Sequence, residues 1–404
     1  MKRSVVMKVE IEKMDNEGRG ITHIDGKVTF VNKTIPEDIV DIEITKNTKN
    51  YNEGIIKNII KESPKRIEPF CPFYYLCGGC DLQNLNYEDT IKYKKETIIN
   101  LFTRKGIIIN PEVIKNSHPL NYRNKIELKV KNKKIGFYEQ RTNRIVEINK
   151  CFIASEAINK AIELLPSFNI INGDIILRSN KNNEVLIIIN SKDNLNLDIE
   201  LIKKQIKLVG IVLNDKNYYG ENYLFETINH HLYKISYNSF FQINPYIAEE
   251  MIKLVEGNIS LNCNVLDLYC GVGALSLNAA KKASKVIGVE VIPNAILNAV
   301  LNSKINKITN TSFVLNDVSK VIDKIAGDID TLIIDPPRSG IQKEVINKIL
   351  EKNPQKIIYI SCNPVTLLRD IELIKNNYTI EKFYIMDMFS YTKHIECMCI
   401  MNRK

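Results

Sequence analysis

The first part of the chain contains short stretches in which apolar and polar residues alternate. Val5 to Ile11 largely alternates apolar with charged residues, and Ile39 to Ile44 repeats the pattern. A period of two is typical of strands with one buried face, and Gly18 to Gly20 and Asp25-Gly26 supply turns between them. Several short strands in residues 1–62 predict a five-stranded β-barrel of the OB type. A β-module with a purely structural role is the alternative.

The middle of the chain, residues 63–236, has a mixed pattern. A segment rich in Pro, Cys and aromatic residues runs from Glu68 to Gln83, and the apolar spacing after it predicts a helix over 87–104. This helix is a candidate for packing on the last part of the chain. A second helix is predicted over 155–165. Strands are predicted over 125–130, 134–138, 144–148, 174–178 and 185–189. We therefore expect a mixed α/β central domain.

From residue 237 to residue 404, predicted strands and helices alternate. The strands are expected at 265–268, 285–290, 312–315, 331–335, 356–361 and 379–387. Alternation of this kind is typical of an α/β fold with a doubly wound, Rossmann-like parallel sheet. Such sheets bind ligands beyond the carboxyl ends of their strands. The residues that follow these strands are therefore the first candidates for a site.

Composition and charge narrow the class of protein. The 404 residues carry a formal net charge of +9, which suits a polyanionic partner. No apolar run approaches the ~20 residues of a membrane helix, and Lys8, Glu10 and Glu12 interrupt any signal-peptide core. Nine cysteines in a chain of this length do not describe a disulfide scaffold. We expect a cytoplasmic protein with reduced thiols, no membrane partner and no obligate protein partner.

The first strand of the C-terminal sheet runs into a glycine-rich turn. Leu266 to Gly273 reads Leu-Asp-Leu-Tyr-Cys-Gly-Val-Gly, and Gly271 and Gly273 let a ligand approach the backbone closely. Glu290 ends the next strand, where a carboxylate can accept hydrogen bonds from both ribose hydroxyls. This layout serves NAD and S-adenosyl-L-methionine (SAM) alike, but Ser276 replaces the third glycine of a dinucleotide site. We favour SAM over NAD, and a tight turn without a ligand is the third interpretation.

Cys362 follows another strand of this sheet, in the sequence Ser-Cys-Asn-Pro. An isolated cysteine is commonly a small buried apolar residue, but a cysteine at a strand tip facing a SAM site suggests a nucleophile. A thiolate that adds to C6 of a pyrimidine makes C5 an enolate carbon, which can then accept a methyl group. We therefore predict Cys362 as the nucleophile of a C5 methylation.

The C5 proton must leave after the methyl group has been added, and its removal needs a general base. Glu396 lies in a late apolar strand, where a carboxylate is costly unless it is paired or functional. It is the candidate base, with a surface-facing glutamate as the alternative. Enzymes that methylate amino groups use an Asp/Asn-Pro-Pro-aromatic turn. Residues 335–338 read Asp-Pro-Pro-Arg, which argues against that reaction.

A group of cysteines precedes the predicted helix at 87–104. Cys71, Cys77 and Cys80 form the pattern C-x5-C-G-G-C, whereas zinc sites usually have two separated C-x2-C pairs. Three close cysteines and a remote fourth suit a [4Fe–4S] cluster, which takes four thiolates. Cys151 is the best remote candidate. We favour an iron–sulfur cluster over zinc.

Together these motifs resemble one family over nearly the whole chain. The chain resembles the RNA (uracil-5-)-methyltransferases, in particular the iron–sulfur branch that includes 23S rRNA (uracil-5-)-methyltransferases. Besides the cysteine pattern, the resemblance rests on Tyr122 to Lys125, Cys151, Ser239 to Asn244, Leu266 to Gly273, Asp335 to Arg338, Ser361 to Pro364 and His394 to Glu396.

The resemblance implies a domain order and a set of roles. It implies an N-terminal TRAM domain of OB type over 1–62, a central domain with the cluster over 63–236, and a class I SAM-dependent methyltransferase domain over 237–404. It also implies Cys362 as nucleophile and Glu396 as base. Five residues fall where family members contact SAM: Gln242, Tyr269, Glu290, Asp317 and Asp335. Ala274 departs from the Asn that family members often carry there, which removes one expected polar contact.

RNA is the expected partner. OB-type barrels bind single strands through basic grooves and stacking, and the first two predicted domains offer Arg19, Lys27, Lys33, Arg123, Lys125, Lys129, Lys131, Lys133 and Lys134. We expect C5 methylation of a specific uridine, in a loop rather than a duplex because the base must leave its stack. The first candidate substrate is 23S rRNA and the second is tRNA. An Fe–S redox protein with an RNA-binding module and a catalytically silent RNA-binding protein are the alternatives from other classes.

Overall fold

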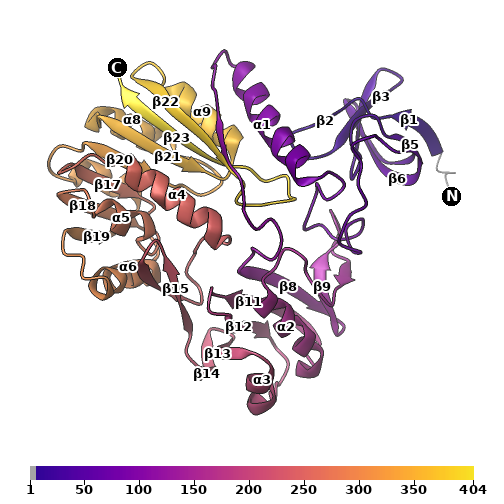
Figure 1. Ribbon diagram of the computed structural model, residues 1–404, viewed down its shortest axis with the longest axis horizontal. Helices are drawn as coiled ribbons and strands as arrows, with labels where there is room; N and C mark the ends of the chain where they lie inside the picture. The colour runs from indigo at the N-terminus through magenta and orange to yellow at the C-terminus, as the bar shows by residue number, and fades with distance from the viewer. Residues whose placement is uncertain (1–5) are drawn as a thin grey trace.

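The N-terminal part of the chain folds into one small sheet. The structure is a computed structural model that describes residues 6–404 (Figure 1). Strands pair in the order β1-β5-β6-β4-β3-β2. They are β1 (Val6–Glu10), β2 (Lys13–Met14), β3 (Gly20–Ile24), β4 (Lys27–Val31), β5 (Ile39–Asn47) and β6 (Tyr51–Lys61). The two-residue strand β2 makes this a six-stranded sheet rather than the five-stranded one that alternation predicts. Val5, the predicted start of the first strand, lies outside the described residues.

The period-two pattern of this sheet corresponds to burial of one face. Val40 and Ile42 alternate with more exposed neighbours on β5 and are fully buried. They pack with Ile11 and Val31 in a small core of their own. The alternation therefore comes from a barrel-like sheet with its apolar side turned inward.

The next segment ties the N-terminal sheet to the C-terminal one. The helix α1 (Tyr87–Thr103) begins after Asn86, whose side chain caps its first turn. Ile98 and Phe102 of α1 are buried in the core of the C-terminal sheet. The short strand β7 (Glu112–Ile114) pairs in parallel with β22 (Tyr378–Met386) at the edge of that sheet. Helix α1 thus packs with the C-terminal sheet and stands beside the N-terminal sheet in Figure 1.

A second sheet forms the central part of the molecule, with strand order β10-β9-β8-β11-β12-β13-β14. Its strands are β8 (Lys125–Lys131), β9 (Lys134–Tyr138), β10 (Ile145–Glu147), β11 (Asn172–Ser179), β12 (Glu184–Ser191), β13 (Lys207–Leu213) and β14 (Lys216–Gly220). Two helices and a short 3-10 helix pack on it: α2 (Glu156–Leu164), η1 (Leu165–Phe168) and α3 (Ile199–Gln205). The first five strands and α2 lie close to their predicted positions, whereas β13 and β14 were not predicted.

A hairpin leads from the central sheet to the third part of the chain. Its strands β15 (Tyr223–Ile228) and β16 (His231–Ser236) pair only with each other. Ile228 and Tyr233 of the hairpin are buried against Met251 of α4 (Pro245–Gly257). The hairpin therefore packs with the C-terminal part, although it precedes residue 237.

The C-terminal sheet has the order β19-β18-β17-β20-β21-β23-β22-β7. Its parallel strands are β17 (Asn264–Leu268), β18 (Lys285–Glu290), β19 (Thr311–Leu315), β20 (Thr331–Ile334) and β21 (Lys356–Ser361). β23 (Glu396–Arg403) runs antiparallel between β21 and β22. The helices are α5 (Ala274–Ala279), α6 (Pro293–Ile305), α7 (Val318–Val321), η2 (Ile322–Lys324), α8 (Lys343–Lys352) and α9 (Pro364–Ile374). This is the doubly wound α/β sheet that the alternation of elements predicts.

Both faces of this sheet are buried, each in its own core. Leu266 and Leu268 of β17 point toward α1, α8 and α9. Val265, one position out of phase, points toward α4 and α5. Burial on both faces explains why these strands read as continuous apolar runs rather than as alternating ones.

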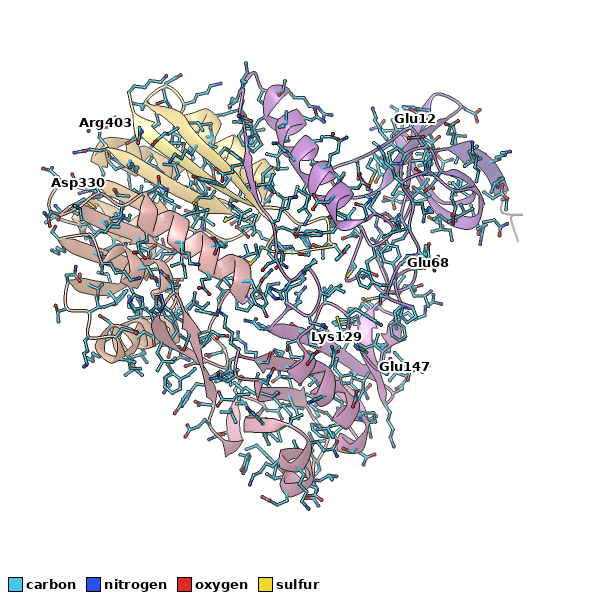
Figure 2. All side chains as sticks on the ribbon, viewed as in Figure 1. Glu12, Glu68, Lys129, Glu147, Asp330 and Arg403 are labelled. Carbon is cyan, nitrogen blue, oxygen red and sulfur yellow. The ribbon has the colours of Figure 1, made fainter. Side chains whose placement is uncertain are left out.

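Figure 2 shows the side chains on the ribbon, and three of the labelled ones, Glu12, Glu147 and Arg403, are exposed. Within residues 6–404, no helix combines the length and the apolar character needed to cross a membrane.

Candidate active site

Side chains from neighbouring strands meet at one edge of the C-terminal sheet. The parallel strands β17, β20 and β21 end at Leu268, Ile334 and Ser361, so the residues that follow them lie at the same edge. β23 runs antiparallel to β21, and the pairing of Ser361 with Cys397 brings Glu396 to this edge as well. The structure therefore brings Cys362 and Glu396 together.

The turn after β17 adopts an unusual backbone. Tyr269, Gly271 and Gly273 all have positive φ, at 66°, 54° and 85°. A Cβ on Gly273 would lie 2.9 Å from Cδ1 of Leu277, so packing requires a glycine there. A Cβ on Gly271 would meet no atom within 4 Å, because this residue faces an opening. The strained backbone of Tyr269, between the strand and the opening, is typical of a ligand-binding turn.

The opening is a cavity, here called the turn cavity. Four of the predicted SAM-binding residues line it: Gln242, Tyr269, Gly271 and Asp335. Ala274, the departure from the family pattern, lines it too. The three other predicted residues do not: Gly273 packs against the protein, Glu290 accepts a hydrogen bond from the Gly271 N–H at 3.2 Å, and Asp317 caps α7 by accepting from the Ser319 N–H.

One acid, Asp335, lines the turn cavity, and a second acid, the buried Asp267, lies on β17 just before the turn. Burial raises the pKa of Asp267 to about 7, and one of its oxygens, Oδ1, has no hydrogen-bond partner. Burial also raises the pKa of Asp335. Each charged carboxylate would be stabilised by a cation placed in the cavity. This donor set suits a positively charged ligand such as a sulfonium and is unfavourable for a pyrophosphate.

Cys362 and Glu396 lie in an environment that raises the pKa of both groups. Burial and the nearby Glu396 raise the pKa of Cys362 to about 11, while the Arg338 guanidinium lowers it by charge and by a hydrogen bond. Burial and Asp335 raise the pKa of Glu396, and Arg338 again lowers it. Arg338 is thus a cation that favours the reactive form of both groups. The sequence pattern identified Arg338 as part of the Asp-Pro-Pro-Arg motif and as an argument against amino-group methylation, but did not predict its position beside Cys362 and Glu396.

A cavity of about 250 Å³, the Cys362 cavity, lies in front of the thiol. Three distant parts of the chain enclose it: Asn16 and Glu17 from the N-terminal sheet, one face of α1, and the segment from Lys393 to Ile395. The participation of the N-terminal sheet and α1 was not predicted, since nothing in their local sequence points to Cys362.

A second cavity of about 410 Å³, the interdomain cavity, shares the lining residues Glu17, Lys393 and His394 with the first. Burial, together with Arg338 and Lys393, lowers the pKa of His394 to about 4, so its imidazole is neutral at pH 7. Four basic residues line this cavity, and all four are ion-paired: Arg19, Lys129, Arg141 and Lys393. A phosphate that binds here would therefore have to displace a carboxylate from its basic partner.

One of the basic residues predicted to face RNA is in fact buried. Lys33 is 6% exposed, lies 4.1 Å from the centroid of the Tyr74 ring and donates to the carbonyl oxygen of Cys80. That prediction was wrong for Lys33, because its side chain turns inward between the N-terminal sheet and the cysteine segment. Arg19 and Lys129 line the interdomain cavity, and their contact with RNA stays a prediction.

The four predicted cluster cysteines come together. Cys71, Cys77, Cys80 and Cys151 line one cavity of about 240 Å³, the cysteine cavity, and all four are free thiols. Burial raises the pKa of each of them. Among residues 6–404, no three His, Cys, Asp or Glu side chains are arranged to hold one metal ion. The cluster thus stays a prediction.

Comparison with known proteins extends over the whole chain. Residues 177–404 match the family described as tRNA (Uracil-5-)-methyltransferase, and residues 3–57 match the TRAM domain. A Fusobacterium nucleatum protein named "uncharacterized RNA methyltransferase" is 34% identical, with 100% of this chain and 97% of that protein covered. A protein of the same name from Halalkalibacterium halodurans is 30% identical, with 99% and 97% covered.

A solved structure shares the whole fold. The tRNA (uracil-54, C5)-methyltransferase of Pyrococcus abyssi, in complex with S-adenosyl-L-homocysteine, superposes with a TM-score of 0.80 at 26% identity. The match covers 98% of this chain and 100% of that one. The similarity therefore includes the N-terminal and central sheets as well as the C-terminal sheet.

Proposed function

Since the chain belongs to the tRNA (uracil-5-)-methyltransferase family, we propose that it transfers a methyl group from SAM to C5 of a specific uridine in structured RNA, through a covalent Cys362 adduct. The carrying observation is the common edge of the C-terminal sheet, where the turn cavity, Cys362 and Glu396 meet. We assign RNA binding to residues 1–62 and methyl transfer to residues 237–404. Residues 63–236 form the central domain, which carries the cysteine group.

The proposed reaction uses two side chains of this chain in turn. The Cys362 thiolate adds to C6 of the uracil, and the electron pair of the C5–C6 double bond moves to form an enolate. C5 then bonds to the methyl carbon while the bond from that carbon to sulfur breaks, leaving S-adenosyl-L-homocysteine. Glu396 removes the proton from C5, the C5–C6 double bond forms again, and Cys362 leaves as a thiolate. Atoms and charges balance without any oxidant or reductant.

The cofactor residues are proposed as a set. We assign SAM binding to Gln242, Tyr269, Gly271, Gly273, Glu290, Asp317 and Asp335. When bound, SAM supplies the methyl group on a cationic sulfur. The buried acids Asp267 and Asp335 fit such a cation, because a positive charge nearby favours their ionised forms. The same charge would lower the pKa of Cys362 and so favour the thiolate.

Two RNA substrates are supported by different observations. The cysteine pattern and the barrel resemble the 23S rRNA branch of the family, which makes 23S rRNA the first candidate. The Pyrococcus abyssi neighbour acts on tRNA by its name, which makes tRNA the second. The Cys362 cavity and the neighbouring interdomain cavity have room for a base turned out of its stack and for the strand next to it.

We propose that Cys71, Cys77, Cys80 and Cys151 hold a [4Fe–4S] cluster. Support comes from the four thiols that line one cavity of about 240 Å³. A cube of iron and sulfide takes one thiolate at each iron, whereas zinc requires its thiolates around one atom. The nine free thiols also suit the reducing cytoplasm, which is where we place the protein.

The test of the proposed function is a labelling assay. Purified protein is incubated with SAM that carries a radiolabelled methyl group and, separately, with unmodified 23S rRNA or tRNA transcripts. We expect label in 5-methyluridine after nuclease digestion of one RNA class. Label in a modified base other than 5-methyluridine, or in neither RNA, would contradict the proposal.

A further inference from the structure

The segment between β22 and β23, here called the 387–395 loop, leads directly to the proposed base. Met386 pairs with Glu396 where the two strands meet, so the loop starts and ends beside the carboxyl group. Its residues Lys393 and His394 line both the Cys362 cavity and the interdomain cavity. The position of this loop therefore determines where Glu396 and two cavity residues stand.

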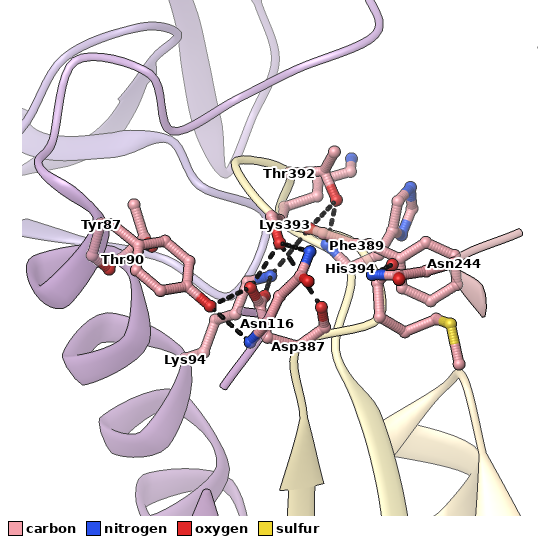
Figure 3. A network of polar contacts seen from close by, with 12 residues as sticks. Tyr87, Thr90, Lys94, Asn116, Asn244, Asp387, Phe389, Thr392, Lys393 and His394 are labelled. Atoms are coloured by element: carbon pink, nitrogen blue, oxygen red, sulfur yellow. Dashed lines mark hydrogen bonds and ion pairs between the residues drawn. The ribbon is translucent and has the colours of Figure 1, made fainter. Parts of the chain in front are cut away.

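Asp387, the first residue of the loop, accepts hydrogen bonds from helix α1 (Figure 3). The Lys94 ammonium donates to Asp387 Oδ1 at 2.7 Å and the Tyr87 hydroxyl donates to Oδ2 at 2.8 Å. Lys94 also donates to the Phe389 carbonyl oxygen at 2.9 Å, and the Phe389 ring lies edge-on to His394. Helix α1 thus holds the loop at both its first residue and its turn.

The Lys94–Asp387 pair is fully enclosed, with each side chain 1% exposed. Within residues 6–404, the only other ion pair with both side chains buried is that of Arg66 and Asp38. A buried ion pair is weak support for stability, because desolvation of the two charges offsets their attraction. Its clearest effect is to define one geometry, since a displaced partner would leave an unpaired buried charge.

Other segments bind the same loop. The Ser390 hydroxyl donates to Asp387 and accepts from the Asn116 side chain at 2.9 Å, and the Tyr122 hydroxyl donates to the Ser390 carbonyl oxygen at 3.2 Å. The Asn244 side chain, two residues after Gln242, donates to the Met388 carbonyl oxygen at 3.4 Å. The loop is therefore attached to the segment that lines the turn cavity.

The cysteine segment and the N-terminal sheet also reach the loop. The backbone N–H groups of Asp81 and Leu82, next to Cys80, donate to the Tyr391 carbonyl oxygen at 3.1 and 3.0 Å. On α1, the Tyr93 hydroxyl donates to the Asp15 carbonyl oxygen at 2.6 Å, next to the cavity residues Asn16 and Glu17. Helix α1 therefore connects the N-terminal sheet to the residue that anchors the loop.

We propose that Asp387 and Lys94 are positioning residues that set Glu396 against the C5 proton, so that base catalysis depends on the docking of helix α1. This inference rests on the proposed function, because it concerns the step that Glu396 performs. It predicts that a loosened loop slows proton removal after methyl transfer has occurred. The methylated RNA then stays bound to Cys362 for longer.

The experiment measures this covalent species. Wild type, Asp387→Asn, Lys94→Met and the double variant are incubated with labelled SAM and a mixture of unmodified 23S rRNA and tRNA transcripts. Samples are denatured in detergent, and the label that stays attached to protein is compared with the total. Melting temperatures are measured in parallel. Asp38→Asn serves as the matched control, because it breaks the other buried pair at a place with no contact to the loop.

We expect the protein-bound fraction to rise by about tenfold in Asp387→Asn, since a misplaced general base loses part of its roughly 100- to 10,000-fold contribution. The double variant removes both charges, so its melting temperature should recover while the protein-bound fraction stays high. Asp38→Asn should lower the melting temperature without raising this fraction.

Three results would overturn the inference. The protein-bound fraction of Asp387→Asn could equal that of the wild type, or the double variant could release RNA at the normal rate. The third is a protein-bound fraction that rises as much in Asp38→Asn as in Asp387→Asn. Each would reduce the ion pair to a general stabilising contact. Failure of the proposed function would look different, because the wild-type protein would then form no 5-methyluridine or Cys362→Ala would still form it.

Discussion

Cys362 and Glu396 stand opposite each other across two antiparallel strands. Ser361 pairs with Cys397, and one further step along each strand brings Cys362 to Glu396. Each carries a raised pKa, and the Glu396 carboxylate itself raises that of Cys362. The two groups that the proposed reaction uses on adjacent ring carbons of one uracil are thus held at neighbouring backbone positions.

Replacement of the thiol tests the nucleophile. Cys362→Ala should lower methyl transfer by at least about 1,000-fold, because C5 is no longer activated by addition at C6. Methyl incorporation into RNA measures this. Cys399→Ala is the matched control, since Cys399 is a buried cysteine of β23 that lines none of the cavities described above. Methylation that persists in Cys362→Ala would exclude the thiolate mechanism.

Replacement of the base tests the second half of the reaction. Glu396→Gln keeps the size of the side chain but removes the proton acceptor, so release should slow by roughly 100- to 10,000-fold while methyl transfer still occurs. Detergent gels should then show labelled RNA attached to protein. A variant that turns over normally, with no attached RNA, would show that another group takes the C5 proton.

Removal of the cation beside the pair tests its electrostatics. Arg338 lowers the pKa of both Cys362 and Glu396, so Arg338→Met should raise both values. The rising limb of kcat/KM against pH reports a deprotonation and should therefore move to higher pH. Arg338→Lys keeps the positive charge, so its rising limb should lie closer to the wild-type position than that of Arg338→Met. A limb that stays in place or moves to lower pH in Arg338→Met would contradict this role.

Gly271 and Gly273 of the turn differ in their surroundings, since only Gly273 is packed against other side chains. Gly271→Ala and Gly273→Ala both place a side chain at positive φ, which costs about 1–2 kcal/mol each. Only Gly273→Ala also drives its Cβ against Leu277 and Ala299, for about 1–3 kcal/mol more. Denaturant unfolding should show the larger loss in Gly273→Ala. Equal losses would mean that the neighbours of Gly273 give way.

The cysteine group can be tested without any activity assay. Anaerobic purification should yield a brown protein with about four irons per chain. Cys151→Ser should lose most of the iron, whereas Cys263→Ser, a buried cysteine outside the cysteine cavity, should keep it. A colourless protein with stoichiometric zinc would replace the cluster with a zinc site.

Local pattern predicted which residues share the carboxyl edge of the C-terminal sheet, because that arrangement follows from where the strands end. Once 265–268, 331–335 and 356–361 are identified as neighbouring parallel strands, the residues after them must share an edge. Strand order alone therefore predicts that Cys362 lies near Tyr269 and Asp335. The burial of Lys33 could not be predicted in this way, because the sequence around a lysine in a loop does not indicate whether its side chain turns inward.

Periodicity, strand-end residues and cysteine spacing in this chain are short-range properties, and they predicted the sheet types, the glycine turn and the cysteine group. The Lys94–Asp387 pair joins residues almost three hundred positions apart. Likewise, the three-residue strand β7 is too short to show any period. Such contacts depend on which surfaces meet when the three sheets assemble. Whether a charged pair is buried therefore depends on this packing and not on the residues next to it in the sequence. For this reason the enclosure of Cys362 by α1, the N-terminal sheet and the 387–395 loop emerged only from the folded chain.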